Sequence, residues 1–294
     1  MRLESLIGTQ LGRYAVTKLL GRGGMAAVFQ ADDSVLRRAV ALKILYSQFL
    51  SDASLVERFR SEAIIAARLE HPNIVPIYDV GEAEGLVYIA MKLLPGRSLQ
   101  DELQMEHAPL STERVIELVT QLGAALDYAH ARGVVHRDIK PGNVMVLDSG
   151  QVVLNDFGIA KSLDAPGMTG TGVLIGTPDY MAPEQINPKQ GPLDGRADIY
   201  SLGVMTYRML TGERPFDGST TEVMMAHLSQ EPPAASARNP RLSPALDAVL
   251  GRAMAKRPED RYQSAGGFAR ALGEAAGAST AVGEATPPPG ARRS

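Results

Sequence analysis

The stretch of residues 134–158 constrains this chain more than any other. Within it, two apolar runs are joined by the turn residues Asp148-Ser149-Gly150, a pattern that predicts a small β-hairpin. Polar residues flank the hairpin, with Asp138 and Asn143 before it and Asp156 after it. Because the two ends of a hairpin lie side by side, folding should bring these three polar side chains close together.

Those three side chains have the chemistry that phosphoryl transfer requires. Mg²⁺ prefers carboxylate and amide oxygens and also binds substrate phosphates, and Asp156 and Asn143 offer one oxygen of each type. Asp138 is left to meet an acceptor hydroxyl. A carboxylate with a pKa of roughly 3.9 is too weak a base to ionise an alcohol beforehand, so we expect it to orient the hydroxyl and to accept its proton late. The alternative, that these aspartates only cap turns, suits Asp148 better than the ordered set.

Composition sets the class of protein. The chain has 294 residues, of which 45% are hydrophobic, enough for a packed core in one large or two modest domains. A net charge of −3 gives no reason to expect a nucleic-acid partner, and the absence of cysteine excludes disulfides and thiolate sites. No signal-peptide core and no apolar run near the roughly 18 residues of a membrane span are present. We therefore expect a cytoplasmic protein without a membrane span.

Two N-terminal features are candidates for binding a phosphorylated ligand. A loosely alternating run over residues 11–20 predicts a strand, and it ends in a glycine cluster at residues 21–24. Gly21 and Gly23 lack a Cβ, so backbone amides there can approach phosphate oxygens closely, although a plain hairpin turn has the same pattern. No helix follows at once, which argues against a dinucleotide-binding or Walker loop. Lys43, inside the apolar run 40–45, either lies on an exposed edge or has a partner.

Helices are predicted on both sides of the hairpin. Ser54 and Glu57 form a capping-box pattern that should open a helix carrying Glu62, which is either the partner of Lys43 or a solvated carboxylate. Ser111 should cap a longer helix with a buried apolar stripe that ends before Gly133. Residues 162–176, rich in glycine and threonine, predict a mobile loop, and residues 273–294 predict a disordered tail.

The motifs taken together resemble the protein kinase family, and among its members the bacterial serine/threonine kinases. The resemblance rests on the glycine cluster, Lys43, His136-Arg137-Asp138-Ile139-Lys140-Pro141-Gly142-Asn143, Asp156-Phe157-Gly158 and the segment 176–184. It covers residues 11–272 in order, with Ala26 standing where the family has its third glycine. It implies an α+β bilobal kinase fold, with a mainly β N-lobe over about 11–94, a mainly helical C-lobe over about 95–272, and ATP in the cleft.

The resemblance also implies roles for individual residues. It gives catalytic roles to Asp138, Lys43, Lys140 and Thr177. Asn143 and Asp156 would bind the metal ion, which would be Mg²⁺ or, in its place, Mn²⁺. The nucleotide would contact Leu20, Gly21, Gly23, Val28, Ala41, Lys43, Glu62, Met91, Lys92, Leu94 and Met145. Structural roles are implied for Asp198, which would bond the catalytic-loop backbone, and for Arg261, which would pair with Glu184.

The function implied is transfer of the γ-phosphoryl of ATP to serine or threonine hydroxyls of proteins, including the enzyme's own loop. Lys140 and Thr177 favour serine/threonine over tyrosine. Phosphorylation of Thr169 or Thr171 would activate the enzyme through Arg137, unless Arg137 serves only a local ion pair. Two alternatives are a catalytically weak scaffold with a kinase fold and a small-molecule kinase, and a transient homodimer is compatible with the resemblance.

Overall fold

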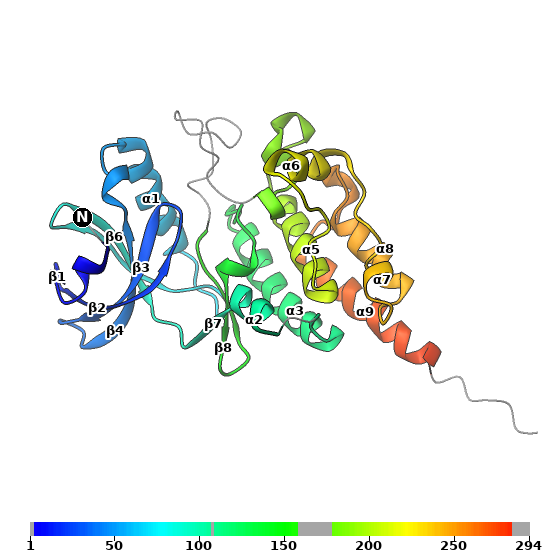
Figure 1. Ribbon diagram of the computed structural model, residues 1–294, viewed down its shortest axis with the longest axis horizontal. Coiled ribbons are helices and arrows are strands. Elements are labelled where there is room, and N and C mark those ends of the chain that lie inside the picture. The colour runs from blue at the N-terminus through cyan, green and yellow to red at the C-terminus, as the bar shows by residue number, and fades with distance from the viewer. Residues whose placement is uncertain (1–2, 107–108, 158–177, 284–294) are drawn as a thin grey trace, which may run out of the picture.

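The computed structural model describes residues 3–106, 109–157 and 178–283, and these form two lobes (Figure 1). Within residues 3–106, the N-lobe is a six-stranded antiparallel sheet in the order β1-β2-β3-β4-β6-β5, with the helix α1 against one face. Its elements are β1 (Gln10–Leu11), β2 (Tyr14–Arg22), β3 (Ala26–Asp33), β4 (Arg38–Leu45), α1 (Ala53–Ala66), β5 (Ile77–Ala83) and β6 (Leu86–Lys92). The glycine cluster is the turn between β2 and β3, as predicted.

Strand β4 is buried on both faces, which explains how a lysine fits inside an apolar run. Side chains alternate along a strand, so Leu42 packs with Tyr14 on one face while Leu45 packs with Phe59 of α1 on the other. Lys43 shares the face of Leu45 and therefore points towards α1. The lysine of the predicted strand is thus placed next to a helix, not on an exposed edge.

Helix α1 begins two residues earlier than the sequence pattern predicted. Asp52 is its N-cap, and the Asp52 carboxylate accepts from the backbone N–H groups of Ser54 (3.0 Å) and Leu55 (3.1 Å). The predicted capping box starting at Ser54 is therefore wrong, because Ser54 lies inside the first turn, where its hydroxyl accepts from Arg58. Aspartate is as good an N-cap as serine, and its negative charge is also stabilised by the positive end of the helix dipole. Asp52 therefore caps the helix in place of Ser54.

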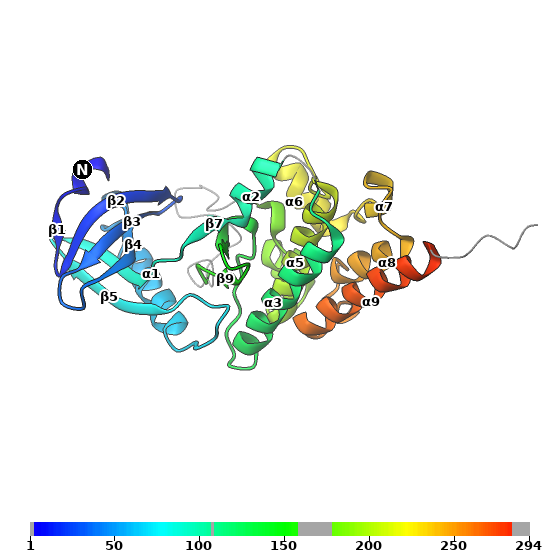
Figure 2. The same cartoon turned by 90° about the horizontal axis from the view of Figure 1, so that it is seen from below.

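The C-lobe is mainly helical (Figure 2). Its elements are β7 (Gly96–Ser98), α2 (Leu99–Glu106), α3 (Thr112–His130), β8 (Val144–Leu147), β9 (Val152–Leu154), α4 (Pro183–Ile186), α5 (Gly195–Thr211), α6 (Thr220–Ser229), α7 (Ala235–Arg238), α8 (Pro244–Ala253) and α9 (Ala265–Gly283). Short 3-10 turns lie at Leu3–Leu6, Ser47–Phe49, Pro141–Asn143, Pro178–Tyr180, Pro188–Gln190 and Pro258–Asp260. Helix α5 is buried on nearly every side, and α3 and α8 pack against it.

The predicted N-cap and apolar stripe of α3 are confirmed. The Ser111 hydroxyl accepts from the Arg114 N–H, and the stripe from Val115 to Ala129 is buried. Where α3 crosses α9, Gly123 allows the close approach, since a Cβ there would lie 3.1 Å from the Ala265 carbonyl oxygen. Asp127 of α3 in turn accepts from the first two backbone N–H groups of α9, which ties the two helices together.

The predicted hairpin is confirmed as β8 and β9, which pair antiparallel next to β7. Backbone hydrogen bonds connect the hairpin to the segment between α1 and β5. The Val75 N–H donates to the Leu154 carbonyl (3.0 Å), and the Leu154 N–H donates to the Asn73 carbonyl (2.8 Å). The hairpin therefore carries the polar residues at its two ends to the boundary between the lobes, where α1 also ends.

Helix α9 continues past the predicted end of the domain. It runs to Gly283, and Ala275 is buried in the C-lobe core, so the prediction of a disordered tail from Gly273 onwards is wrong for residues 273–283. Leu272 and Ala275 lie about one turn apart and are both buried in the C-lobe core, so packing on the core continues the helix past its predicted end. In the described part of the chain, no helix combines the length and apolarity needed to cross a membrane.

Candidate active site

Asp198, in the first turn of α5, holds the backbone of the segment that precedes the hairpin. Its carboxylate is fully buried and accepts from the N–H groups of His136 (2.8 Å) and Arg137 (2.7 Å) and from His130 Nε2 (2.7 Å). A buried carboxylate is stable only when it is bonded in this way, and the helix N-terminus favours its charge. The expected bond from Asp198 to the catalytic-loop backbone is thus present.

His136 connects the two polar clusters at the ends of the hairpin. Its Nε2 lies 2.8 Å from the carbonyl oxygen of Asn155, and its Nδ1 accepts from the N–H of Asp138 (3.2 Å). Because a carbonyl can only accept, Nε2 carries the proton, and burial lowers the pKa of His136 so that it stays neutral. One imidazole therefore sets the spacing between Asp138 and the residue before Asp156.

The Asp138 carboxylate is held by two neighbours on the same loop. Lys140 Nζ lies 2.8 Å from Asp138 Oδ2, and Asn143 Nδ2 donates to the same oxygen (2.9 Å) and to the Asp138 carbonyl (2.8 Å). These bonds fix the carboxylate in one orientation and stabilise its charge. The structure thus brings together Lys140 and Asp138, two residues to which the resemblance gives catalytic roles.

Lys43 of β4 meets two carboxylates from distant parts of the chain. Its Nζ lies 2.9 Å from Asp156 Oδ1 and 3.6 Å from Glu62 Oε1, and it stands over the Phe59 ring. Burial would lower the pKa of Lys43, but the two carboxylates raise it, so the lysine is charged. Burial raises the pKa of Glu62 to about 7, with Lys43 offsetting part of that rise. Glu62 is therefore a partner of Lys43, as predicted, and Asp156 is the nearer of the two carboxylates.

The residues expected to hold a metal suit a hard divalent cation. Both Asn143 Nδ2 bonds go to Asp138, which leaves the amide oxygen as the ligating atom, and the Asp156 side chain is 38% exposed. Among the described residues no group of three or more His, Cys, Asp or Glu is placed to hold a metal ion. A metal here would take two protein oxygens and complete its shell with water and phosphate, as Mg²⁺ does.

Apolar side chains from both lobes gather where the resemblance places the nucleotide. One cluster contains Ala41, Met91, Val28, Leu94 and Met145. Leu20 lies outside it, at the end of β2, and is 43% exposed.

Two backbone features limit how a nucleotide could be held there. The Lys92 N–H already donates to the Pro76 carbonyl (3.0 Å), so this N–H is not available to a nucleotide. Gly21 lies near the end of β2, and the Gly23 N–H donates to the Ala26 carbonyl across the β2–β3 turn.

Arg137 sits beside Asp138 in a strained backbone conformation. Its φ is +66°, and its carbonyl accepts from Gln185 Nε2 (2.8 Å), so bonds on both sides hold it in place. Burial lowers the pKa of Arg137, and within the described residues its buried Nε has no hydrogen-bond partner. A buried guanidinium donor without a partner is uncommon and suits an anion that arrives from elsewhere.

The end of the segment 176–184 is anchored to the C-lobe. Glu184 and Arg261 form a bidentate pair at 2.7 and 2.8 Å, and both side chains are fully buried. Ser201 Oγ donates to the Tyr180 carbonyl (2.6 Å), which fixes the residues just before it. The expected Glu184–Arg261 pair is therefore confirmed, while Thr169, Thr171 and Thr177 lie outside the described residues.

Sequence reasoning missed several residues that organise this site. It gave no role to His130, Asn155 or Gln185, and it did not assign the two-sided role of His136. The sequence around these residues has no pattern that marks their carbonyl, amide or imidazole groups as hydrogen-bond partners of the catalytic loop. Only the fold brings them within hydrogen-bond distance.

Comparison with known proteins identifies the domain. The family model described as "Protein kinase domain" matches residues 14–270. This chain belongs to the protein kinase family. Relatives that are 42–43% identical over most of the chain are serine/threonine-protein kinases. The kinase domain is therefore of the serine/threonine class of ATP-binding phosphotransferases.

Individual relatives are mycobacterial. The serine/threonine-protein kinase PknJ of Mycobacterium tuberculosis is 43% identical over 282 residues, 94% of this chain and 47% of that protein. PknD of the same species is 42% identical, over 92% of this chain and 40% of that protein. The crystal structure of the Mycobacterium tuberculosis PknI kinase domain matches with a TM-score of 0.75 at 34% identity, covering 92% of this chain and 98% of that one. The kinase chain thus spans about half the length of the curated relatives that it matches, and nearly all of a solved kinase domain.

Proposed function

We propose that this kinase transfers the γ-phosphoryl of ATP to serine and threonine hydroxyls of protein substrates. The observation that carries the proposal is the arrangement around Asp138, whose carboxylate is held by Lys140 and Asn143 next to the Lys43–Asp156 ion pair. Charged groups from both lobes meet at one place, which suits a reaction that depends mainly on positioning and charge stabilisation.

Each residue of the proposed mechanism acts through its position. Lys43 holds the α- and β-phosphates of ATP, and Glu62 keeps the lysine in place. Asp138 orients the acceptor hydroxyl and accepts its proton late, while Lys140 stabilises the charge on the transferred group. When bound, Mg²⁺ supplies Lewis-acid neutralisation of the phosphates, and Asn143 and Asp156 would hold it. The resemblance assigns the remaining catalytic role to Thr177, which lies outside the described residues.

Two alternatives are weaker. A non-catalytic scaffold would be favoured by loss of Lys43, Asp138, Asn143 or Asp156, and all four are present. A small-molecule kinase would have no use for a peptide-docking segment, whereas here residues 178–184 are anchored by a fully buried ion pair. The anchored segment favours a protein substrate.

The proposed function is tested by mapping phosphosites by mass spectrometry after incubation with Mg-ATP, with and without a generic protein substrate. We expect phosphoserine and phosphothreonine in both the enzyme and the added protein. Asp138→Asn is the matched control because it keeps the shape and the bond from Asn143 to the backbone. No new phosphosite in either protein, or equal phosphorylation by Asp138→Asn, would contradict the assignment.

We further propose that phosphorylation of Thr169 or Thr171 activates the kinase through Arg137. The support is the buried Arg137 Nε without a partner in the described residues, together with its position next to Asp138. A phosphate adds about −1.5 to −2 charges and pairs well with a guanidinium.

The test compares peptide-kinase activity of phosphatase-treated and autophosphorylated enzyme, in wild type, Arg137→Ala and the double variant Thr169→Ala/Thr171→Ala. We expect phosphorylation to raise wild-type activity only. A full response by Arg137→Ala would show that another group reads the phosphate.

The remaining parts of the proposal concern location and partners. We propose that this catalytic part acts in the cytoplasm, with no nucleic-acid partner, and that two copies meet transiently during autophosphorylation. A mixture of active kinase and a tagged Asp138→Asn copy tests the last point, because phosphate on the inactive copy can come only from a second molecule.

A further inference from the structure

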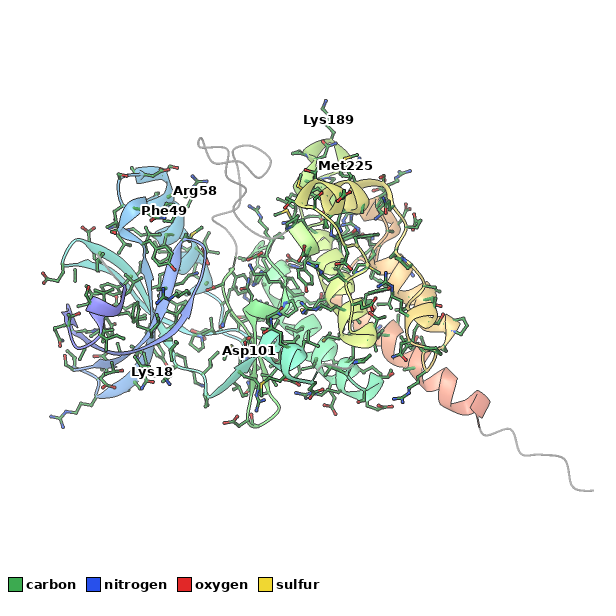
Figure 3. All side chains as sticks on the ribbon, in the orientation of Figure 1. Lys18, Phe49, Arg58, Asp101, Lys189 and Met225 are labelled. Atoms are coloured by element: carbon green, nitrogen blue, oxygen red, sulfur yellow. The ribbon has the colours of Figure 1, made fainter. Side chains whose placement is uncertain are left out.

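A cavity of about 520 Å³ lies beside the catalytic loop of the C-lobe. Its wall is built from five parts of the chain: the loop residues Lys140 to Gly142, the residues Asp179 and Tyr180, the end of α5 at Arg208, Gln100 of α2, and the residues Gly212, Glu213, Arg214 and Asp217 that follow α5. In Figure 3 the neighbouring α2 residue Asp101 marks this side of the lobe. A volume of this size accommodates one or two side chains of a bound peptide.

Most charges in the cavity wall are already paired. Arg214 binds both Asp179 and Asp217, the second at 2.7 Å, and Glu213 binds Arg238. Lys140 is paired with Asp138. A basic side chain entering the cavity would have to compete with these arginines for every carboxylate.

Arg208 is different because its partners are neutral. Its Nη1 donates to the Tyr180 hydroxyl (2.6 Å) and to Gln100 Oε1 (3.0 Å), and in the described residues no carboxylate pairs with it. Burial raises the pKa of Tyr180, so the phenol stays neutral beside the guanidinium. The half-buried positive charge of Arg208 is therefore uncompensated, while two hydrogen bonds fix its orientation.

We propose that this cavity, here called the Arg208 pocket, binds a carboxylate or phosphate side chain of the peptide substrate close to its acceptor hydroxyl. The inference rests on the proposed function, because it assigns a substrate class to the same site. Lys140 joins the two places, since it lines the pocket and its Nζ lies 2.8 Å from Asp138 Oδ2. An extended peptide advances about 3.3 Å per residue, so the acidic group lies within about three residues of the acceptor.

The chain itself contains a segment in which an acidic group and an acceptor hydroxyl could lie within three residues of each other. Thr169 and Thr171 are two residues apart in the sequence, so a phosphate on one of them lies within that distance of the other. The Arg208 pocket would then favour the second phosphorylation once the first has occurred on a neighbouring copy. Autophosphorylation would follow an order set by the pocket.

The test uses a set of peptides that share one threonine acceptor and differ at a single position, from three residues before it to three after. That position carries aspartate, phosphoserine, asparagine or arginine, so carboxylate and phosphate are compared directly. The quantity measured is the ratio of kcat/KM between acidic and asparagine peptides for one enzyme, which is independent of the folded fraction. We expect a ratio of about ten or more at one position or more in wild type.

Four variants test whether Arg208 is responsible. Arg208→Gln should bring the ratio close to one, and Arg208→Glu should make the arginine peptide the better substrate at the same position. Gln100→Glu places a carboxylate beside Arg208 without removing it and should also abolish the preference, which covers the case in which changes at Arg208 unfold the protein. Arg257→Gln, a change at an exposed arginine outside the pocket, should leave the ratio unchanged.

The outcomes separate this inference from the proposed function. If wild type phosphorylates the acidic and asparagine peptides equally, or if Arg208→Gln and Gln100→Glu keep the full preference, the Arg208 pocket is not a specificity site. If no peptide and no protein is phosphorylated, the kinase activity itself is overturned, and the pocket assignment with it.

Discussion

The two lobes each bury a carboxylate with a cation, but in opposite ways. In the C-lobe, Arg261 and Glu184 are fully buried, and the guanidinium also donates to the carbonyls of Ala255, Lys256 and Arg196. All five N–H donors of that arginine are thus used. Lys43 of the N-lobe instead meets two carboxylates, Asp156 of the C-lobe at 2.9 Å and Glu62 of its own lobe at 3.6 Å.

The difference indicates which pair is structural and which can adjust. A saturated bidentate pair has one arrangement, and any change leaves buried charges without partners. Lys43 faces two carboxylates, one from α1 and one from the end of the hairpin. Because one of them can be released, Lys43 can shift its contacts when phosphates arrive. We therefore infer that the C-lobe pair supports the docking segment and that the N-lobe cluster serves the reaction.

The largest expected effect is on stability, from Arg261→Met. Removing the guanidinium leaves the buried Glu184 without its charged partner and takes one donor from each of three backbone carbonyls, and we expect a loss of about 3–5 kcal/mol in the free energy of unfolding. Urea denaturation measures it. Arg257→Gln, which breaks an exposed pair with Glu259, is the control and should cost less than about 1 kcal/mol. A loss below about 1 kcal/mol for Arg261→Met would remove the contrast between the lobes.

The reciprocal change is Lys43→Met, which should act on turnover. We expect kcat/KM to fall by about 10²–10³-fold, because the phosphates lose their positioning charge, while the melting temperature stays close to that of wild type. Glu62 can accept a proton when its partner is lost, which limits the cost to the fold. Turnover at the wild-type level would show that Lys43 is not part of the reaction. A large loss of stability would make the N-lobe pair as structural as the C-lobe one.

A smaller effect is expected from pH. Glu62 has a pKa raised by burial to about 7, so the ion pair with Lys43 is lost as pH falls through that value. The kcat/KM for ATP, which reports the free enzyme, should be about tenfold lower at pH 6 than at pH 8, and Glu62→Gln should show no step in this range. A step of equal size in Glu62→Gln would assign the titration to another group.

Stability should respond to Glu62 in the opposite direction. An acid whose folded pKa lies above its ordinary value of 4.5 stabilises the folded state below pH 4.5, and this contribution is lost as pH rises through about 7. Wild type should therefore lose free energy of unfolding relative to Glu62→Gln between pH 5 and pH 8. Activity and stability of the N-lobe cluster would then have opposite pH dependence.

The smallest effect concerns the start of α1, the helix that carries Glu62. Asp52→Ala should cost about 1 kcal/mol in the free energy of unfolding, since it removes the acceptor for two backbone N–H groups. Ser54→Ala, the matched change at the residue that the sequence pattern had favoured, should cost less than about 0.5 kcal/mol. The reverse order in urea denaturation would restore Ser54 as the cap.

Much of the site could be predicted because its parts are local in sequence. The hairpin 144–154 and the stripe of α3 follow from periodicity, and Asp138, Lys140 and Asn143 are close neighbours on one loop. The start of α1 was not predicted correctly, because Asp52 and Ser54 both suit an N-cap and only the backbone geometry chooses between them. The end of α9 was missed because its helical residues are small and weakly patterned.

By itself, the sequence determined which residues are available for the proposed chemistry, since the proposed metal ligands, the proposed catalytic carboxylate and the lysine occur at family spacing. Tertiary structure alone decided what those residues meet. Lys43 and Asp156 are 113 positions apart and touch at 2.9 Å, and Arg208 meets Gln100 from 108 positions away. Such contacts depend on how β4, α2 and α5 pack. Local periodicity records which face of an element is buried, but not which residue from another element lies against it.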